Sequence, residues 1–269
     1  MQERQNSVAY TFRCNVPGIQ VTDETLAAAK YAQECGIEHR IVEIYWDDFA
    51  NFAPALIKQK GAPIHSIEVQ IYKAALQAKK DGFTKFIFGE SADCIYGGLS
   101  KLLSRDWKVG EFIERYSYVK PHVALKEPVL IYEPIKRFEN NGYIDVHGFL
   151  NDVFYKESTA SYFNACDLAQ IDFVAPFMMT FMDSPLDITR VRKGENKYIV
   201  RDIFSRLYHG FIIPKKTPMP RPMNKWLHNW EGPTRPEFWP NCVEGMSGDQ
   251  KWLVYCLEWF LNLLEDGVI

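Results

Sequence analysis

The sequence lacks the features that mark several large classes of protein. Its 269 residues carry a net charge of −3, so it has no basic surplus of the kind that binds nucleic acid or anionic membranes. No apolar run reaches the length of about 20 residues that spans a bilayer, and the polar start MQERQNS has no signal-peptide core. We therefore expect a cytoplasmic protein whose partners include neither nucleic acid nor a membrane.

The cysteine and histidine patterns exclude two further kinds of site. The six cysteines form no CxxC pair, and the six histidines form no HxxxH or HExxH pair. This spacing fits neither a zinc site nor a disulfide scaffold. Reduced cytosolic thiols are the simplest interpretation, and we expect no metal site built on histidine and cysteine.

What the chain does have is the composition of an ordinary globular protein, with 47% apolar and 24% charged residues. The length is sufficient for one large domain with a sizeable core. In the first hundred residues, strand-like and helix-like periods alternate. We expect strands at 8–12, 40–46 and 84–88, a first helix capped by Thr22 or Asp23 and ended by Gly36, and a second helix capped by Ser66.

Strands that alternate with helices at this spacing predict βαβ units. The expected fold class is therefore α/β, with a doubly wound, mainly parallel sheet. We expect a single domain over 1–269, composed of an α/β half (1–103) and a largely helical half (104–269). The second half includes a hairpin-like or loop segment at 138–146, a helix over about 195–208 and a proline-rich loop at 213–223.

The last predicted helix, 252-WLVYCLEWFLNLLED-266, is apolar nearly all round. Such a helix is expected to be buried against the core. A contact in a homo-oligomer is the alternative.

Two carboxylates follow the third strand in 85-KFIFGESADCIYGG-98. Ligands of parallel sheets bind beyond the carboxyl ends of the strands, which is where Glu90 and Asp93 are expected. Adjacent carboxylates repel, so either a cation lies between them or one of them has a raised pKa. The alternative is that both are ordinary acids at a helix N-terminus, favoured by the helix dipole.

Several segments, in the same order along the chain, resemble the synthetase domain of the asparagine synthase family, a branch of the ATP pyrophosphatases. FGESADCIYGG resembles the family's SGEGADELFGGY, and 173-FVAPFMMTFMDSPL-186 is similar to RVPFLDHRLVEFA. The segments 194-GENKYIVRDIF-204 and 213-IPKKTPMPRPMNKWL-227 resemble G-K-x-x-L-R…RPKxGFxxPxxxWL. Upstream, 23–44 resembles the family's second βα unit, DE-x-x-x-A-x-x-x-A-x-x-x-G-x-x-H.

The resemblance implies an adenine nucleotide alpha hydrolase-like fold whose nucleotide-binding half is 1–103. It also implies an ATP-dependent, amide-forming reaction with ATP and Mg²⁺ as cofactors. A small-molecule or peptide carboxylate attacks the α-phosphate of ATP, pyrophosphate leaves, and a nitrogen nucleophile displaces AMP from the acyl-adenylate.

Residue roles follow from the same resemblance. Asp93 is implied as a Mg²⁺ ligand, Glu90 as the base that takes the proton of the attacking amine, and Lys197 as the catalytic cation that contacts the phosphates. The residues implied at the nucleotide are Phe12, Gly89, Lys197 and Lys216. The alternatives are a solvated helix lysine for Lys197 and a simple helix-ending turn for Gly97-Gly98.

The sequence also departs from the family pattern. It contains no SGGxDS pyrophosphate loop; the nearest similar segment, 245-GMSGDQK-251, follows no predicted strand. We expect that a βα unit of about 25 to 35 residues lies upstream of Met1 or on a separate N-terminal fragment. The glutaminase domain is also missing, with Gln2 where its cysteine nucleophile would stand, so nitrogen would come from ammonia, a partner glutaminase or an amine substrate.

Three functions remain open from the sequence. The first is an ATP-dependent synthetase that is complete only with that unit. The second is a catalytically inactive pseudoenzyme, a binding module or one half of a split enzyme. The third is an unrelated enzyme whose acidic pair, Glu90 and Asp93, binds a metal without ATP.

Overall fold

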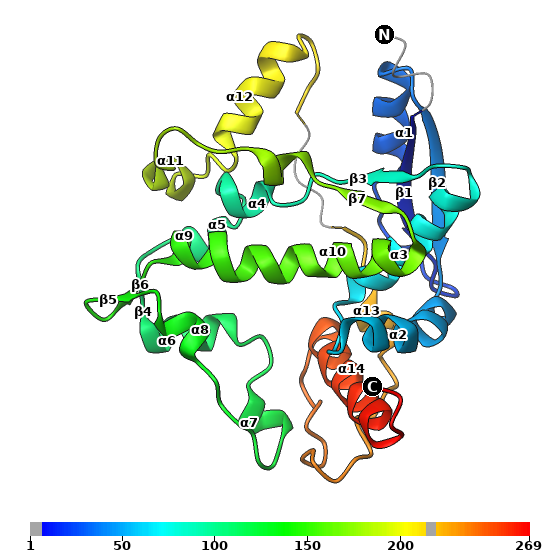
Figure 1. Cartoon of the computed structure of the whole chain (residues 1–269), viewed down its shortest axis with the longest axis vertical. Coiled ribbons are helices and arrows are strands. Elements are labelled where there is room, and N and C mark those ends of the chain that lie inside the picture. The colour runs from blue at the N-terminus through cyan, green and yellow to red at the C-terminus, as the bar shows by residue number, and fades with distance from the viewer. Residues whose placement is uncertain (1–6, 214–218) are drawn as a thin grey trace.

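The computed structural model describes residues 7–213 and 219–269. Gln2 and Lys216 therefore lie outside the described residues. The chain is a mixed α/β protein in which small, separate groups of strands lie beside and between helices (Figure 1). Its strands are β1 (Val8–Cys14), β2 (Glu38–Ile44), β3 (Lys85–Ile87), β4 (Trp107–Lys108), β5 (Glu139–Asn140), β6 (Tyr143–Ile144) and β7 (Asp172–Val174).

Helices make up most of the remaining regular structure. Those of the first 150 residues are α1 (Thr25–Glu34), α2 (Trp46–Lys60), α3 (Ser66–Lys80), α4 (Ala92–Ile95), α5 (Ser100–Leu103), α6 (Val109–Tyr116), α7 (Pro121–Ala124), α8 (Glu133–Lys136) and α9 (Val146–Phe149). A π-helical turn, Leu150–Phe154, leads into α10 (Tyr155–Ala169). After a 3₁₀ turn at Pro176–Met179 come α11 (Ile188–Arg192), α12 (Tyr198–Leu207), α13 (Met223–Trp226) and α14 (Gly248–Glu265).

The parallel strands form two separate pairs. β1 runs parallel to β2, from Val8 opposite Glu38 to Cys14 opposite Ile44, and β3 runs parallel to β7, with Phe86 opposite Phe173. The parallel direction was expected, but the single doubly wound sheet is not seen within the described residues. The partner of β3 comes from the second half of the chain, and β1 and β3 share no ladder in that part of the chain.

Most predicted boundaries of the first half are confirmed to within a few residues. Two details are wrong. The cap of α3 is His65, whose ring accepts a hydrogen bond from Ile67 N, while the Glu68 carboxylate accepts one from His65 N at 2.9 Å. The cap position of α1 is Glu24, although Asp23 accepts a hydrogen bond from Thr25 N at 2.9 Å.

The main core lies where α2, α3 and α10 pack together, with α14 against α2. The small residues Ala74, Ala75 and Ala78 on one face of α3 are fully buried and allow α10 to approach closely. Trp252 of α14 is 1% exposed and stacks edge-on against Phe49 of α2. The predicted burial of the last helix is confirmed for its first half, while its end is exposed at Leu264.

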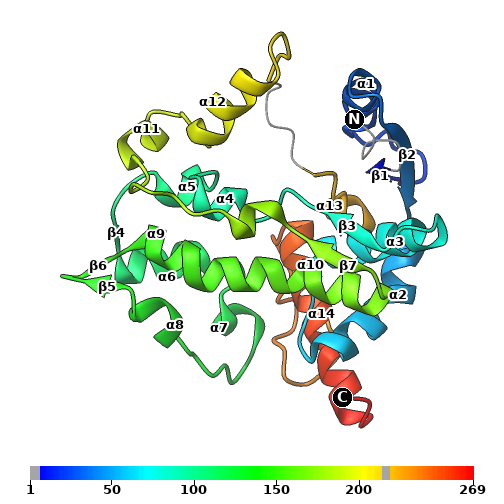
Figure 2. The same cartoon turned by 45° about the horizontal axis from the view of Figure 1, so that its top comes forward.

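A second hydrophobic cluster, between residues 102 and 191, holds the hairpin region together. β5 and β6 form the antiparallel hairpin expected at 138–146, and β4 pairs with β6. Phe112 and Phe149 are its fully buried centre. α12 has no fully buried side chain, and its first residue, Tyr198, packs partly buried against the second cluster. Figures 1 and 2 show the rest of α12 extending away from α10. No helix of the described ranges is long and apolar enough to cross a membrane.

Candidate functional site

The turn after β3 has an unusual backbone. Gly89 is exposed, Glu90 is half-buried, and Ser91 caps α4 with a left-handed φ of +73°. A serine in this region is strained because its Cβ crowds the backbone, and the family pattern has glycine at this position. The Ser91 side chain is 1% exposed, and its Oγ has no hydrogen-bond partner among the described residues. Strained residues with spare polar atoms are typical of ligand sites.

Asp93 and Lys197, which are 104 positions apart, meet in an ion pair of 2.9 Å between Nζ and Oδ1. Lys197 is the cap residue of α12 and also has a left-handed φ, of +53°. Gly98 makes this contact possible, because a Cβ at that position would overlap Asp93 Oδ1 and Lys197 Cε. The Gly97-Gly98 pair therefore does more than end a helix.

Glu90 is tied to α10. Ser158 donates a hydrogen bond of 2.7 Å to Glu90 Oε1. Burial, together with the nearby Glu90 carboxylate, raises the pKa of Tyr162 far above its ordinary value, so the phenol stays protonated. Glu90 thus faces hydroxyl groups on α10.

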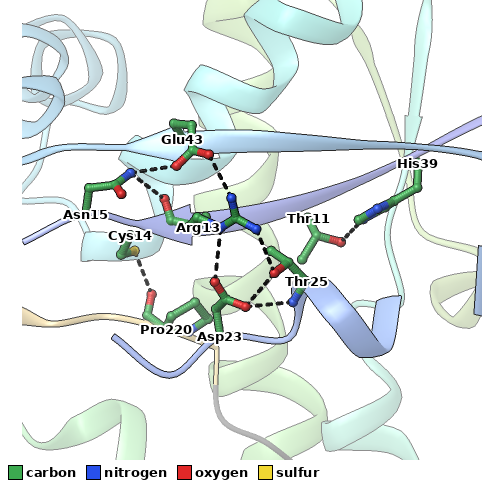
Figure 3. Close-up of polar contacts among 9 residues, drawn as sticks. All are labelled: Thr11, Arg13, Cys14, Asn15, Asp23, Thr25, His39, Glu43 and Pro220. Atoms are coloured by element: carbon green, nitrogen blue, oxygen red, sulfur yellow. Dashed lines mark hydrogen bonds and ion pairs between the residues drawn. The ribbon is translucent and has the colours of Figure 1, made fainter. Parts of the chain in front are cut away.

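A second polar group lies at the carboxyl end of β1 (Figure 3). Arg13 is 3.3 Å from Asp23 and 3.3 Å from Glu43, and Asn15 donates to Glu43 at 2.6 Å. Burial opposes ionisation of Asp23, but its hydrogen bonds with Thr25 and Arg13 outweigh this and lower its pKa. A hollow of about 760 Å³, lined by residues 13–16, 19–23, 25 and 26, opens here. This is the edge where parallel strands bind ligands.

Residues 219–222 run beside the polar group at the end of β1. The Pro220 carbonyl accepts hydrogen bonds from Cys14 Sγ at 3.3 Å and from Gln70 Nε2 at 3.0 Å, and Figure 3 shows Pro220 beside the β1 group. The next residue, Arg221, lies 3.2 Å from the His65 ring. This part of the segment that resembles RPKxGFxxPxxxWL therefore contacts both β1 and the N-terminus of α3.

The structure brings some of the predicted site residues together. Asp93 and Lys197 are in direct contact, and Glu90 is three residues before Asp93 in the sequence. Phe12 is on β1, half-buried against the main core, and Gly89 has open space around it. Lys216 lies outside the described residues. Sequence reasoning missed Ser158, Tyr162 and Arg13, and no spacing in the sequence points to the two α10 residues.

The cysteines are mostly buried. All six thiols are free, and Cys94 is fully buried, where burial followed by Glu90 and Asp93 raises its pKa to about 12. A thiol of this kind is not a nucleophile at neutral pH.

No group of three His, Cys, Asp or Glu side chains that could hold a metal ion occurs within residues 7–213 and 219–269. A nucleotide-borne Mg²⁺ needs only one or two protein carboxylates and otherwise uses water and phosphate. Asp93 suits that role, and the buried Ser91 Oγ and Asn196 Oδ1, which lack partners among the described residues, leave polar atoms for a ligand. The side chains fit a phosphate-bound ion better than a dedicated metal cage.

Comparison with known proteins gives one match. No curated protein and no solved structure matches the chain. The asparagine synthase family model matches residues 1–161, which is 161 of 269 residues or about 60% of the chain. Members of this family are ATP-dependent, amide-forming synthetases, and their domain has the adenine nucleotide alpha hydrolase-like fold. The sequence motifs, the parallel strand pairs and this match lead to one conclusion: the chain belongs to the asparagine synthase family.

Proposed function

We propose that the chain activates a carboxylate substrate as an acyl-adenylate at the expense of ATP, releasing pyrophosphate, and then transfers the acyl group to nitrogen. The observation that carries this proposal is the Asp93–Lys197 pair, enclosed at Gly98 beside Glu90. A lysine and an acid at the carboxyl end of a parallel strand suit the charge that develops on phosphate during adenylation.

Each side chain has a distinct task in this proposal. Lys197 neutralises phosphate charge, and Asp93 orients the Lys197 ammonium group. Asp93 would also hold a phosphate-borne Mg²⁺, which would offset the negative charge of the leaving pyrophosphate. Glu90 accepts the proton that the attacking nitrogen loses. In this proposal Phe12 on β1 and Gly89 in the turn after β3 border the nucleotide, and Lys216 adds a further cation.

A second candidate function is that of one half of a split enzyme, or of a binding module with the same fold. It is favoured by the strand arrangement, because β1 and β3 each pair on one side only within the described residues. Their aromatic side chains still meet, with the Tyr10 and Phe86 rings 5.7 Å apart. A strand–loop–helix fragment could pair with these edges. A separate glutaminase and a homo-oligomer through α14 are further proposed partners.

The test is ATP–pyrophosphate exchange across a broad panel of carboxylic acids. We measure the chain alone and mixed with a segment of about 30 residues that carries an SGGxDS loop between a strand and a helix. Lys197→Ala should lower the exchange rate by about 100-fold or more, the usual effect of losing one group that stabilises transition-state charge. Lys193→Ala, at an exposed lysine four positions earlier, is the matched control.

The outcomes separate the two functions. Exchange that needs Lys197 and tolerates Lys193→Ala supports the synthetase. Exchange only in the mixture supports the split enzyme. If neither sample shows exchange with any acid, the synthetase proposal is wrong and the binding module remains.

A further inference from the structure

A second hollow, of about 290 Å³, lies close to Glu90, between the N-terminus of α3, α10 and α14. Its volume is near the lower end of the range found for small-molecule sites. Ile67 of α3, Phe154 before α10 and Leu253 of α14 give it an apolar wall. The hollow is formed by three elements that are far apart in the sequence.

The hollow connects to the candidate base. Ser158 lines it and donates the 2.7 Å hydrogen bond to Glu90, and Tyr162 lines it one turn later on α10. A molecule in the hollow would therefore have one end close to Glu90.

The charges around the hollow favour a cation. Lys60 lines it, but its ammonium group is 2.6 Å from the fully buried Glu68 carboxylate and is neutralised there. Glu157 accepts a hydrogen bond from the Tyr116 hydroxyl at 2.8 Å, and Glu90 accepts one from Ser158. Neither carboxylate forms an ion pair within the described residues.

The other titratable or charged groups near the hollow do not cancel the negative charge of these two carboxylates. The His65 side chain is exposed on one side. Desolvation of its ring by the surrounding protein, together with the positive charges of Arg221 and Lys60, lowers its pKa to about 4. The ring is therefore neutral at pH 7. Among the described residues, Arg221 is the one cation in this region that no carboxylate neutralises, against the two carboxylates of Glu90 and Glu157.

We infer that this hollow binds the nitrogen nucleophile as a primary amine with an apolar body, rather than ammonia. Ammonia has no group to cover the apolar wall, whereas an aryl or alkyl body would bury it. This inference rests on the proposed function for the chemical step. There the bound ammonium first releases one proton to solvent, and the freed lone pair on nitrogen bonds to the acyl carbon. The bond from that carbon to the AMP oxygen breaks, the nitrogen's second proton passes to Glu90, and AMP leaves.

Binding can be measured without ATP. We titrate the full chain with phenethylamine at pH 7.5 by calorimetry and saturation-transfer NMR, beside the neutral 2-phenylethanol and the anionic 3-phenylpropanoate. The amine should bind about tenfold more tightly than either of these compounds, which corresponds to a difference of roughly 1.4 kcal/mol in binding free energy. Glu157→Gln should weaken the amine and leave the alcohol unchanged.

A second pair of variants locates the site. Leu253→Trp should fill the hollow and weaken the amine by about tenfold or more. Leu264→Trp, on the exposed end of the same helix, should have no effect. If Leu253→Trp lowers the melting temperature strongly, Ile67→Phe replaces it.

Equal binding of the amine and the alcohol overturns the inference, as does unchanged binding in a folded Leu253→Trp variant. If the protein catalyses pyrophosphate exchange and forms an amide with ammonium but does not bind the amine, the inference about the hollow is also overturned. The synthetase proposal then still stands. Selective amine binding without exchange supports the site and counts against the synthetase.

Discussion

The contact between Asp93 and Lys197 depends on the absence of a side chain at Gly98. The two groups fill the space that a Cβ would occupy, and Gly98 N also donates to Asp93 O at 2.9 Å. Ser91 and Lys197 add two left-handed backbone positions at the same place. The candidate site therefore depends on local backbone geometry as well as on charged groups.

Gly98→Ala should displace Asp93 or Lys197 and so damage the site. We expect a loss of about 1–3 kcal/mol in the free energy of unfolding, the usual cost of overpacking, and a lower exchange rate or nucleotide affinity. Urea denaturation and a nucleotide titration measure the two effects. The matched control is Gly110→Ala, since Gly110 lies in α6 with open space around it. Equal behaviour of the two variants would contradict the role given to Gly98.

At the scale of elements, one buried carboxylate joins three helices. Glu68 of α3 is 0% exposed; it receives the Lys60 ammonium from the end of α2 and the Asn164 amide of α10 at 2.9 Å. It also accepts from His65 N and so closes the first turn of α3. This network holds together α3 and α10, two of the three helices that form the hollow near Glu90.

Glu68→Ala should destabilise the protein by about 3–5 kcal/mol, because it leaves the half-buried Lys60 without its partner. Chemical denaturation measures the change. Glu34→Ala removes a surface carboxylate from the exposed pair with Lys30 and should cost less than about 1 kcal/mol. A loss for Glu68→Ala as small as that of the control would show that the network does not hold the helices together.

For the whole molecule, the titratable groups whose pKa differs between the folded and unfolded states set a pH range of greatest stability. The pKa of His65 in the folded protein, about 4, is below its ordinary 6.5, so folding favours the neutral ring. Its contribution is present above pH 6.5 and is lost as the pH falls towards 4. Burial, joined at Cys14 by the nearby Asp23, raises the thiol pKa of both Cys14 and Cys166 from 9.0 to about 12. That contribution is present below pH 9 and is lost as the pH rises towards 12.

We therefore expect the free energy of unfolding to be highest between about pH 6.5 and 9. Denaturant midpoints measured from pH 4 to 11 test this range. His65→Gln should flatten the decline between pH 6.5 and 4, and Cys166→Ala should reduce the decline above pH 9. A profile that is flat from pH 4 to 6.5 in the unaltered protein would contradict the assignment to His65.

Much of the fold could be read from local patterns. The strands at β1, β2 and β3, the hairpin at β5 and β6, and the helices α12 and α14 follow alternation, turn residues and helical periods. The sequence analysis did not predict helix α2, because Pro54 and the bulky residues Trp46 and Phe49 obscure the helical pattern of apolar residues there. In the structure Pro54 lies inside this helix. The cap of α3 was assigned one residue too late because a histidine performs the role expected of serine.

The sequence by itself determined the family, the α/β class and the identity of Glu90, Asp93 and Lys197 as candidates, because ordered motifs and short-range periods are properties of the linear chain. Only the tertiary structure decided that Asp93 meets Lys197 across 104 positions, that Ser158 and Tyr162 face Glu90, and that an apolar hollow lies beside it. The reason is physical. These contacts come from the packing of α10 against α2 and α3 and from the room left at Gly98, and packing depends on the shapes of side chains that are distant in the sequence.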